Sequence, residues 1–125
     1  METPERNRLE SNKQREAIRA VFAEWEKLPR MPSDWKIVSV QDVQHERYAL
    51  QHVSFAKDRY DTRLLAYLEI RDGKIWLLTD NTEEGIATEL VTAGISKDAI
   101  VLGFYPPAIR EIGDFAVLEY FGSTH

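Results

Sequence analysis

Carboxylates are the most frequent side chains in this sequence that could do chemistry, and four of them lie close together. Asp72, Asp80, Glu83 and Glu84 fall within one short stretch. If two or three of these groups converged on one ion, they would form the centre of a metal-dependent nuclease. A structural interpretation is simpler, because Asp72 precedes a turn glycine and the two glutamates fall in the first turn of a predicted helix, where acids stabilise the helix dipole. We therefore assign no metal ligand.

A second group of acids matches a restriction-type nuclease core only in part. Such a core would have one acid and then, on the following strand, an acid-x-lysine. Asp61 with Glu69-Ile70-Arg71 comes nearest, but arginine stands where lysine is wanted. A metal-dependent nuclease is therefore kept as the alternative function and not as the preferred one.

Other residue types used in catalysis are scarce. The chain has no cysteine, which excludes disulfides, thiolate catalysis and thiolate metal sites. His45 and His52 would face opposite sides of a strand, and His125 is the last residue. Ser54 and Ser96 lie outside any Gly-x-Ser-x-Gly elbow. We assign no catalytic, cofactor-binding or metal-binding residue and expect no cofactor.

The net charge of −5 argues against direct nucleic-acid binding. Such binding draws most of its free energy from lysine and arginine displacing counterions from phosphate. The only basic enrichment, from Arg6 to Arg19, is interleaved with glutamates at a spacing typical of a solvated helix face. Residues 1–12 are polar, and no segment approaches the roughly 18 apolar residues of a membrane span. We expect a cytoplasmic protein with no membrane partner.

The elements that must position these side chains follow from hydrophobic periodicity. An apolar stripe with a spacing of three and four residues predicts a helix over 5–28, polar in its first half. Alternation then predicts strands over 35–43, 47–55, 62–71 and 74–79, a second helix, a strand over 99–104 and a last short strand over 115–121. This order predicts a single α+β domain with an antiparallel sheet of about five strands and both helices on one face.

Local signals set the ends of these elements. Asp72-Gly73 predicts a tight hairpin, because both central residues of a type I′ turn need positive φ. Asn81 or Thr82 is expected to cap the second helix, since Asn81 and Glu84 form a capping-box pattern. Gly94 suits the end of this helix. Gly85 is not explained by the sequence, beyond close packing or contact with a partner.

The last part of the chain is rich in aromatic residues and is our candidate partner interface. One reading is that these residues complete the core and an edge strand. The other is that they bind a protein, because aromatic anchors dominate the energy of interfaces. A final strand could also pair with a second copy through its edge, which predicts a homo-oligomer, most simply a dimer. The candidate residues are Phe104, Tyr105, Pro106, Pro107, Phe115, Tyr120 and Phe121.

The chain resembles the XisI family, the fdxN-element excision controlling factors found mainly in cyanobacteria. The resemblance rests on Asp72-Gly73-Lys74-Ile75-Trp76, Thr82-Glu83, Gly85-Ile86-Ala87, Glu89-Leu90-Val91, Gly94, Ile100-Val101-Leu102-Gly103-Phe104 and Phe115-Ala116-Val117. It covers roughly residues 14–121, so we divide the chain into a polar extension, 1–13, and an XisI-like domain, 14–125. Leu78, Asn81 and Tyr105 depart from residues common in the family, which argues against catalysis at those positions.

The resemblance implies a small accessory protein needed for programmed excision of a DNA element during heterocyst development. It would act beside a site-specific recombinase and the XisH protein, and the family has no accepted catalytic residues to carry over. We therefore predict a non-enzymatic controlling factor that binds a protein partner, most simply an XisH-like one. An acidic surface suits a basic partner. The alternative is a metal-dependent nuclease or a direct DNA-binding factor.

Overall fold

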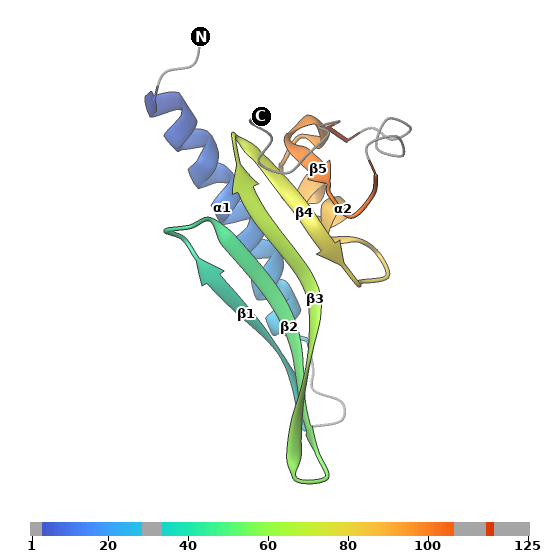
Figure 1. The fold of residues 1–125 in the computed structure, drawn as a ribbon. Coiled ribbons are helices and arrows are strands. Elements are labelled where there is room, and N and C mark those ends of the chain that lie inside the picture. Colours follow the sequence, from blue (N-terminus) through green and yellow to red (C-terminus); the bar gives the residue numbers. More distant parts are fainter. Residues whose placement is uncertain (1–3, 29–33, 107–114, 117–125) are drawn as a thin grey trace.

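The computed structural model describes residues 4–28, 34–106 and 115–116, with side chains from residue 8 onward. Figure 1 shows a twisted sheet with two helices behind it. In chain order the elements are α1 (Pro4–Glu26), β1 (Trp35–Asp42), β2 (Arg47–Ala56), β3 (Arg59–Arg71), β4 (Lys74–Asp80), α2 (Ile86–Thr92), the 3-10 turn η1 (Lys97–Ala99) and β5 (Ile100–Leu102).

The five strands form one sheet in the order β1-β2-β3-β4-β5. The first four pair antiparallel, and β5 pairs parallel to β4. The parallel pair follows from the connection, because α2 carries the chain back to the starting end of β4 before β5 begins. The predicted α+β fold with a five-stranded sheet and two helices is confirmed, and the sheet is mixed at this one edge.

Helix α1 packs one face on the sheet and leaves its first half exposed. Ile18, Val21 and Phe22 are buried in the core, with Trp25 packed against it, as the spacing predicts, and Ala17 is buried as well. Leu28, which belongs to the same predicted stripe, is instead 47% exposed. The helix ends at Glu26, two residues earlier than predicted. None of its side chains from residue 8 to residue 13 is buried, although this polar segment belongs to the same helix.

One hydrophobic core joins both helices to one face of the sheet. Its sheet and loop members are Tyr48, Leu50, Ala66, Leu68, Ile70, Ile75, Leu77, Ile95 and Ile100, and α2 adds Ile86, Ala87 and Leu90. Polar contacts fix α1 at two turns of the sheet. Gln14 Nε2 donates to the carbonyl of Gly73 at 2.7 Å, and Arg15 Nε donates to Glu46 Oε1 at 2.8 Å. Both helices therefore lie on the same face, as predicted.

Two hairpin turns have positive φ at both central residues. Asp72 and Gly73 have φ of 52° and 76°, which confirms the predicted turn. Lys57 and Asp58 have φ of 53° and 64°, so the turn between β2 and β3 is also tight. The predicted turn over 56–61 was too long, because β3 begins at Arg59. The resulting β2–β3 hairpin extends well past the helices (Figure 1).

The predicted cap of the second helix is wrong. Helix α2 begins at Ile86, and Asp80 holds the preceding loop instead: its Oδ2 accepts from Ile86 N at 2.7 Å, and its Oδ1 accepts from Thr82 N at 3.0 Å and Thr82 Oγ1 at 2.6 Å. Asn81 Nδ2 donates to the carbonyl of Leu64. Gly85 has φ of +92°, which explains the glycine, because side chains strain this conformation.

The end of the described chain lies beside β5. Strand β5 spans three residues, shorter than the predicted 99–104. Ala116 N donates to Ile100 O at 2.9 Å, so the first part of the predicted last strand meets the edge of the sheet. Residues 117–121 of that predicted strand lie outside the described residues. Within the described part of the chain, no helix is long and apolar enough to cross a membrane.

Candidate functional site

The acids that suggested a metal site are kept apart by the sheet. Asp72 lies in the turn before β4, and Asp80 ends that strand. The six steps from Lys74 to Asp80 alone span about 20 Å, at about 3.3 Å per residue. Both oxygens of Asp80 are engaged in hydrogen bonds within its loop. Asp80 therefore has a structural role, while Asp72 supplies a turn.

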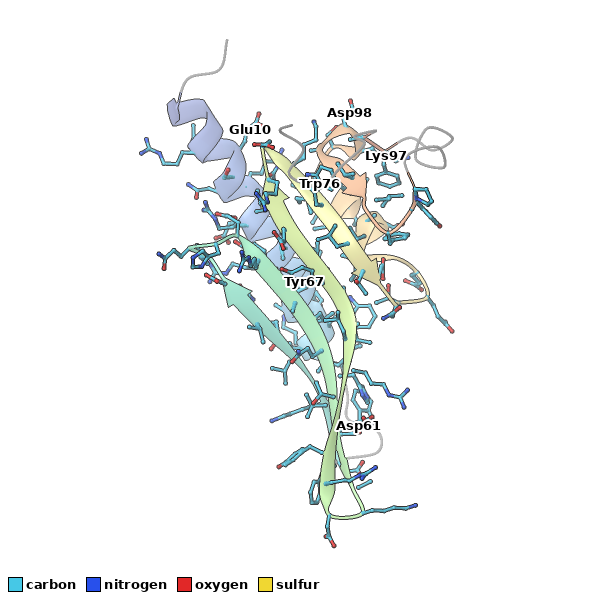
Figure 2. The ribbon with its side chains drawn as sticks, in the orientation of Figure 1. Glu10, Asp61, Tyr67, Trp76, Lys97 and Asp98 are labelled. Atoms are coloured by element: carbon cyan, nitrogen blue, oxygen red, sulfur yellow. The ribbon has the colours of Figure 1, made fainter. Side chains whose placement is uncertain are left out.

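Asp61 and Glu69 lie far apart on the same strand. They are eight positions apart on β3, about 26 Å at 3.3 Å per residue. Figure 2 shows Asp61 on the projecting hairpin and Tyr67 in the body of the sheet. Glu69 is only 8% exposed and accepts from the Tyr67 hydroxyl at 2.5 Å. Burial and then this bond raise the pKa of Tyr67 to about 12. The pattern that resembled a nuclease core does not converge.

The two described histidines have local partners. The Nδ1 atom of the His45 ring lies 2.8 Å from Asp42 Oδ2, and the backbone N–H of His45 donates to Asp42 Oδ1. The His45 backbone bond, and then the ring, lower the pKa of Asp42. The ring of His52 stacks on Trp35 with centroids 5.0 Å apart. His125 lies outside the described residues. Across residues 8–28, 34–106 and 115–116, no three His, Asp or Glu side chains gather as a metal site would need.

The aromatic residues predicted as a partner interface are described only in part. Phe104 and Tyr105 lie just after β5, are 40% and 43% exposed, and place their rings 4.5 Å apart. Pro106 is exposed beside them. Phe115 is half-buried against the core, with Lys97 Nζ 6.0 Å above its ring. Pro107, Tyr120 and Phe121 lie outside the described residues. The interface itself stays a prediction.

A groove lies between α1 and α2. One cavity of about 490 Å³ is lined by Glu24, Trp25, Leu28, Glu83, Glu84 and Glu89. A second, of about 350 Å³, is lined by Ala20, Val21, Glu24, Glu84, Thr88, Glu89, Thr92 and Ala93. The two cavities share three glutamates, so they are parts of one surface, which we call the α1–α2 groove.

The α1–α2 groove combines apolar side chains with charges of a single sign. Trp25 and Leu28 supply apolar surface, and Leu28 is 47% exposed. Four glutamates line the groove, and among the described residues neither lysine nor arginine lines it. Lys27 lies beside the rim, where its Nζ is 3.3 Å from Glu24 Oε1. Within the described part of the chain the other three carboxylates form no ion pair, so the groove is an acidic surface over an apolar floor.

Glu89 is the least exposed acid of this groove, since it is half-buried whereas the other three glutamates are exposed. Trp25 Nε1 donates to both of its carboxylate oxygens at 3.0 Å. Burial raises the pKa of Glu89, and the nearby charges of Glu84 and Asp80 raise it further, while the Trp25 bond acts in the opposite direction. An ammonium or guanidinium group from a partner would relieve this repulsion. The groove is therefore suited to a basic side chain that lies beside apolar contacts.

Sequence reasoning did not find this groove, although a signal for it exists. Trp25 was interpreted as a core residue, and Glu83 and Glu84 as residues of a helix start. Residues 75–96 contain several acids and no lysine or arginine. That imbalance could have indicated an acidic surface, but the sequence does not show that α1 lies opposite it.

Comparison with known proteins places the chain in a family. The family model for XisI protein matches residues 9–117. A crystal structure of a XisI-like protein from Anabaena variabilis is 25% identical with a TM-score of 0.69, and the match covers 84% of this chain and 95% of that chain. The structure of fdxN element excision controlling factor XisI from Anabaena variabilis is 26% identical with a TM-score of 0.71, covering 87% of this chain and 99% of that one. No curated protein matches. The chain belongs to the XisI family.

Proposed function

We propose that this protein is a non-enzymatic controlling factor for the excision of a DNA element by site-specific recombination, and that it acts by binding a basic protein partner. Its family and its likeness to a protein called fdxN element excision controlling factor support the link to excision. The observation that carries partner binding is the α1–α2 groove, with its apolar floor and acidic lining. A role in DNA excision also implies a cytoplasmic location.

The chemistry of the groove defines the partner that would fit it. Charges of a single sign steer a partner of opposite charge and repel a second copy of the same surface. The exposed apolar surface of Leu28, with the half-buried Trp25 beside it, offers the contact area that charges alone do not. A partner segment with lysine or arginine next to apolar side chains would satisfy both. An XisH-like protein is the partner that the family resemblance implies, and a site-specific recombinase is the second.

The positions of the acids support a binding role over a nuclease role. The Asp80 carboxylate accepts hydrogen bonds in the loop before α2. The Glu69 carboxylate accepts a hydrogen bond from Tyr67 and pairs with Arg71. Asp72 lies in the turn before β4, and Asp61 lies on β3 near the other hairpin turn. Neither of these two carboxylates joins Asp80 or Glu69. The acids that do lie together, in the α1–α2 groove, border apolar surface, which suits a protein segment.

The test is co-expression of the full chain with an XisH-like protein, followed by light scattering on the purified material. We expect a complex that is weakened by Glu84→Lys and is retained by Glu10→Lys, which changes the net charge equally. Glu10 is exposed on α1 and lies about 21 Å from Glu24 along the helix axis, at 1.5 Å per residue. Absence of a complex, together with DNA cleavage by the isolated chain in Mg²⁺, would establish the nuclease alternative instead.

A further inference from the structure

Among the described residues, no further strand pairs with the outer edge of β1. Strand β1 ends the sheet on one side, has eight residues and pairs with β2 without a register shift. It contains neither proline nor glycine, and Val40 is 53% exposed. The opposite edge differs, because β5 has only three residues and already receives the N–H of Ala116. Protein sheets normally protect a long edge with charges, bulges or proline, because it is a template for pairing with another strand.

Two hydrogen bonds show which backbone N–H and C=O groups of β1 point away from β2. Phe55 N donates to Asp34 O, and Ser39 N donates outward to Glu26 Oε2 at 3.4 Å. Because inward and outward groups alternate along an antiparallel strand, the N–H and C=O of Ile37, Ser39 and Gln41 point away from β2. These are the groups that a further strand would bind. Figure 1 shows β1 at the outer margin of the sheet.

The side chains of β1 are complementary to themselves. The face of β1 turned away from the helices carries Lys36, Val38, Val40 and Asp42, in that order. If a second β1 runs antiparallel about a two-fold axis at Ser39, then Lys36 lies opposite Asp42 of the second copy and Val38 lies opposite Val40. Directly opposite side chains in such a pair have Cβ atoms about 5 Å apart, close enough for contact. Two charge pairs would then flank a cluster of four valines.

This register is also the one that the charges select. A shift of the axis to Val38 would place Asp42 opposite Asp34, and a shift to Val40 would place Val38 opposite Asp42. Only the axis at Ser39 pairs both charges and brings exposed Val43 opposite Trp35. The pKa of Asp42 is lowered by His45, so this carboxylate is ionised at neutral pH. Side-chain pattern is what fixes strand register in sheets.

We propose that two copies of this chain associate through the outer edges of their β1 strands, antiparallel about a two-fold axis at Ser39, to form one continuous ten-stranded sheet. A two-fold contact uses the same patch on both copies, and the order of charges in β1 meets that requirement. The proposal does not rest on the proposed function. It also uses a different surface from the aromatic segment on which the sequence-based expectation of a dimer was founded.

Glu26 limits the strength of this association. Its carboxylate extends from α1 to β1, where Oε1 lies 3.1 Å from Ser39 Oγ and Oε2 lies 3.4 Å from Ser39 N. Pairing of two β1 strands would replace the bond to Ser39 N with a backbone bond, and it would bring the two Glu26 side chains near each other. The interface is also short, and interfaces below about 1,200 Å² are typically weak. We expect a dissociation constant in the micromolar range and a tighter dimer for Glu26→Gln.

The test is a charge exchange read by analytical ultracentrifugation of the full chain. Lys36→Asp and Asp42→Lys should each weaken self-association about tenfold or more, because each replaces two attractive contacts with two repulsive ones. An equimolar mixture of the two variants should restore association, because every contact in the mixed dimer joins opposite charges. A wild-type chain that stays monomeric, a dimer that neither variant weakens, or a mixture that stays monomeric while both variants remain folded would overturn the proposal.

A cross-linking variant gives a second readout, in case Asp42→Lys disturbs the turn that His45 holds. The chain has no cysteine, so Ser39→Cys introduces a single thiol at the proposed axis. Opposed residues of a hydrogen-bonded antiparallel pair have Cα atoms about 5.5 Å apart, within the range of disulfides. Mild oxidation should give a covalent dimer for Ser39→Cys and little for Thr62→Cys on the exposed hairpin. Equal cross-linking of both variants would contradict the proposed axis.

Discussion

The α1–α2 groove and the outer edge of β1 differ in how their charges are arranged. The groove carries four glutamates and, among the residues that the structure describes, no lining cation, so two grooves would repel each other. The edge of β1 carries one lysine and one aspartate, placed symmetrically about Ser39. A single-sign surface calls for a different protein, whereas a balanced and symmetric one fits its own copy. The proposed partner contact and the proposed self-contact would therefore lie on two separate surfaces of the chain.

The largest expected effect is the loss of self-association through β1, without loss of partner binding, in a Val40→Lys variant. Val40→Lys places a cation among the valines of the proposed pair, a device with which natural proteins protect edge strands. We expect self-association to fall about a hundredfold, or about 3 kcal/mol in each dimer, because the change occurs twice. Ultracentrifugation measures it, with Leu9→Lys as the charge-matched control. Binding of the basic partner should be unchanged, and a shared loss would show that the two surfaces are not separate.

Asp80→Ala should disturb the groove without touching the edge. It removes a carboxylate that accepts three hydrogen bonds in the loop before α2. We expect a loss of about 1–3 kcal/mol in the free energy of unfolding, measured in urea. Asp72→Asn is the control, because asparagine tolerates the positive φ at that turn and should cost little. Unchanged stability of Asp80→Ala, with a wild-type melting temperature that rises in Mg²⁺, would instead assign Asp80 to a metal.

Glu84→Lys should weaken partner binding while leaving self-association intact. It reverses one charge on the rim of the groove, shared by both cavities. We expect about a tenfold loss of affinity for the basic partner, mostly through slower association, and a reduced dependence on salt. Surface plasmon resonance at two salt concentrations measures both. An affinity that responds to neither the substitution nor the salt would show that the partner binds elsewhere.

The smallest expected effect is that of Glu89→Gln, which should change stability and partner binding in opposite directions. The raised pKa of Glu89 means that its ionised form is disfavoured in the folded chain. Glu89→Gln should therefore raise the free energy of unfolding slightly at neutral pH, by less than about 1 kcal/mol because the side chain is partly exposed. The gain should disappear as the pH falls and wild-type Glu89 takes up its proton. The same variant should bind the basic partner more weakly, a combination that a purely structural role for Glu89 does not predict.

The fold was largely predictable because its signals are local. Alternation placed the first four strands, and Asp72-Gly73 placed a hairpin whose φ values the structure confirms. The start of α2 was not predictable in the same way. Asn81 and Glu84 form a capping pattern, but the Asp80 carboxylate binds both Thr82 and Ile86, and Gly85 adopts positive φ just before the helix. Bonds across the loop outweighed the local propensity.

The candidate sites were much less predictable, because each depends on contacts between distant segments. The Trp25–Glu89 bond joins residues 64 positions apart. No pattern within α1 or α2 reveals that their acidic and apolar side chains share one groove. The symmetry of β1 is visible in the sequence as Lys36, Val38, Val40 and Asp42, but its meaning depends on β1 being an edge strand. The residues of both surfaces can therefore be identified in the sequence, whereas their contacts depend on the fold.

The most direct test of the central claim is the mass, measured by light scattering, of the wild-type chain mixed with an XisH-like protein, set beside the same mixtures for Glu84→Lys and Glu10→Lys. The account predicts a complex for the wild-type and Glu10→Lys chains and a clear loss of complex for Glu84→Lys, while all three remain folded. Equal complex formation by all three chains would contradict binding at the α1–α2 groove, and no complex with any of them would contradict partner binding itself.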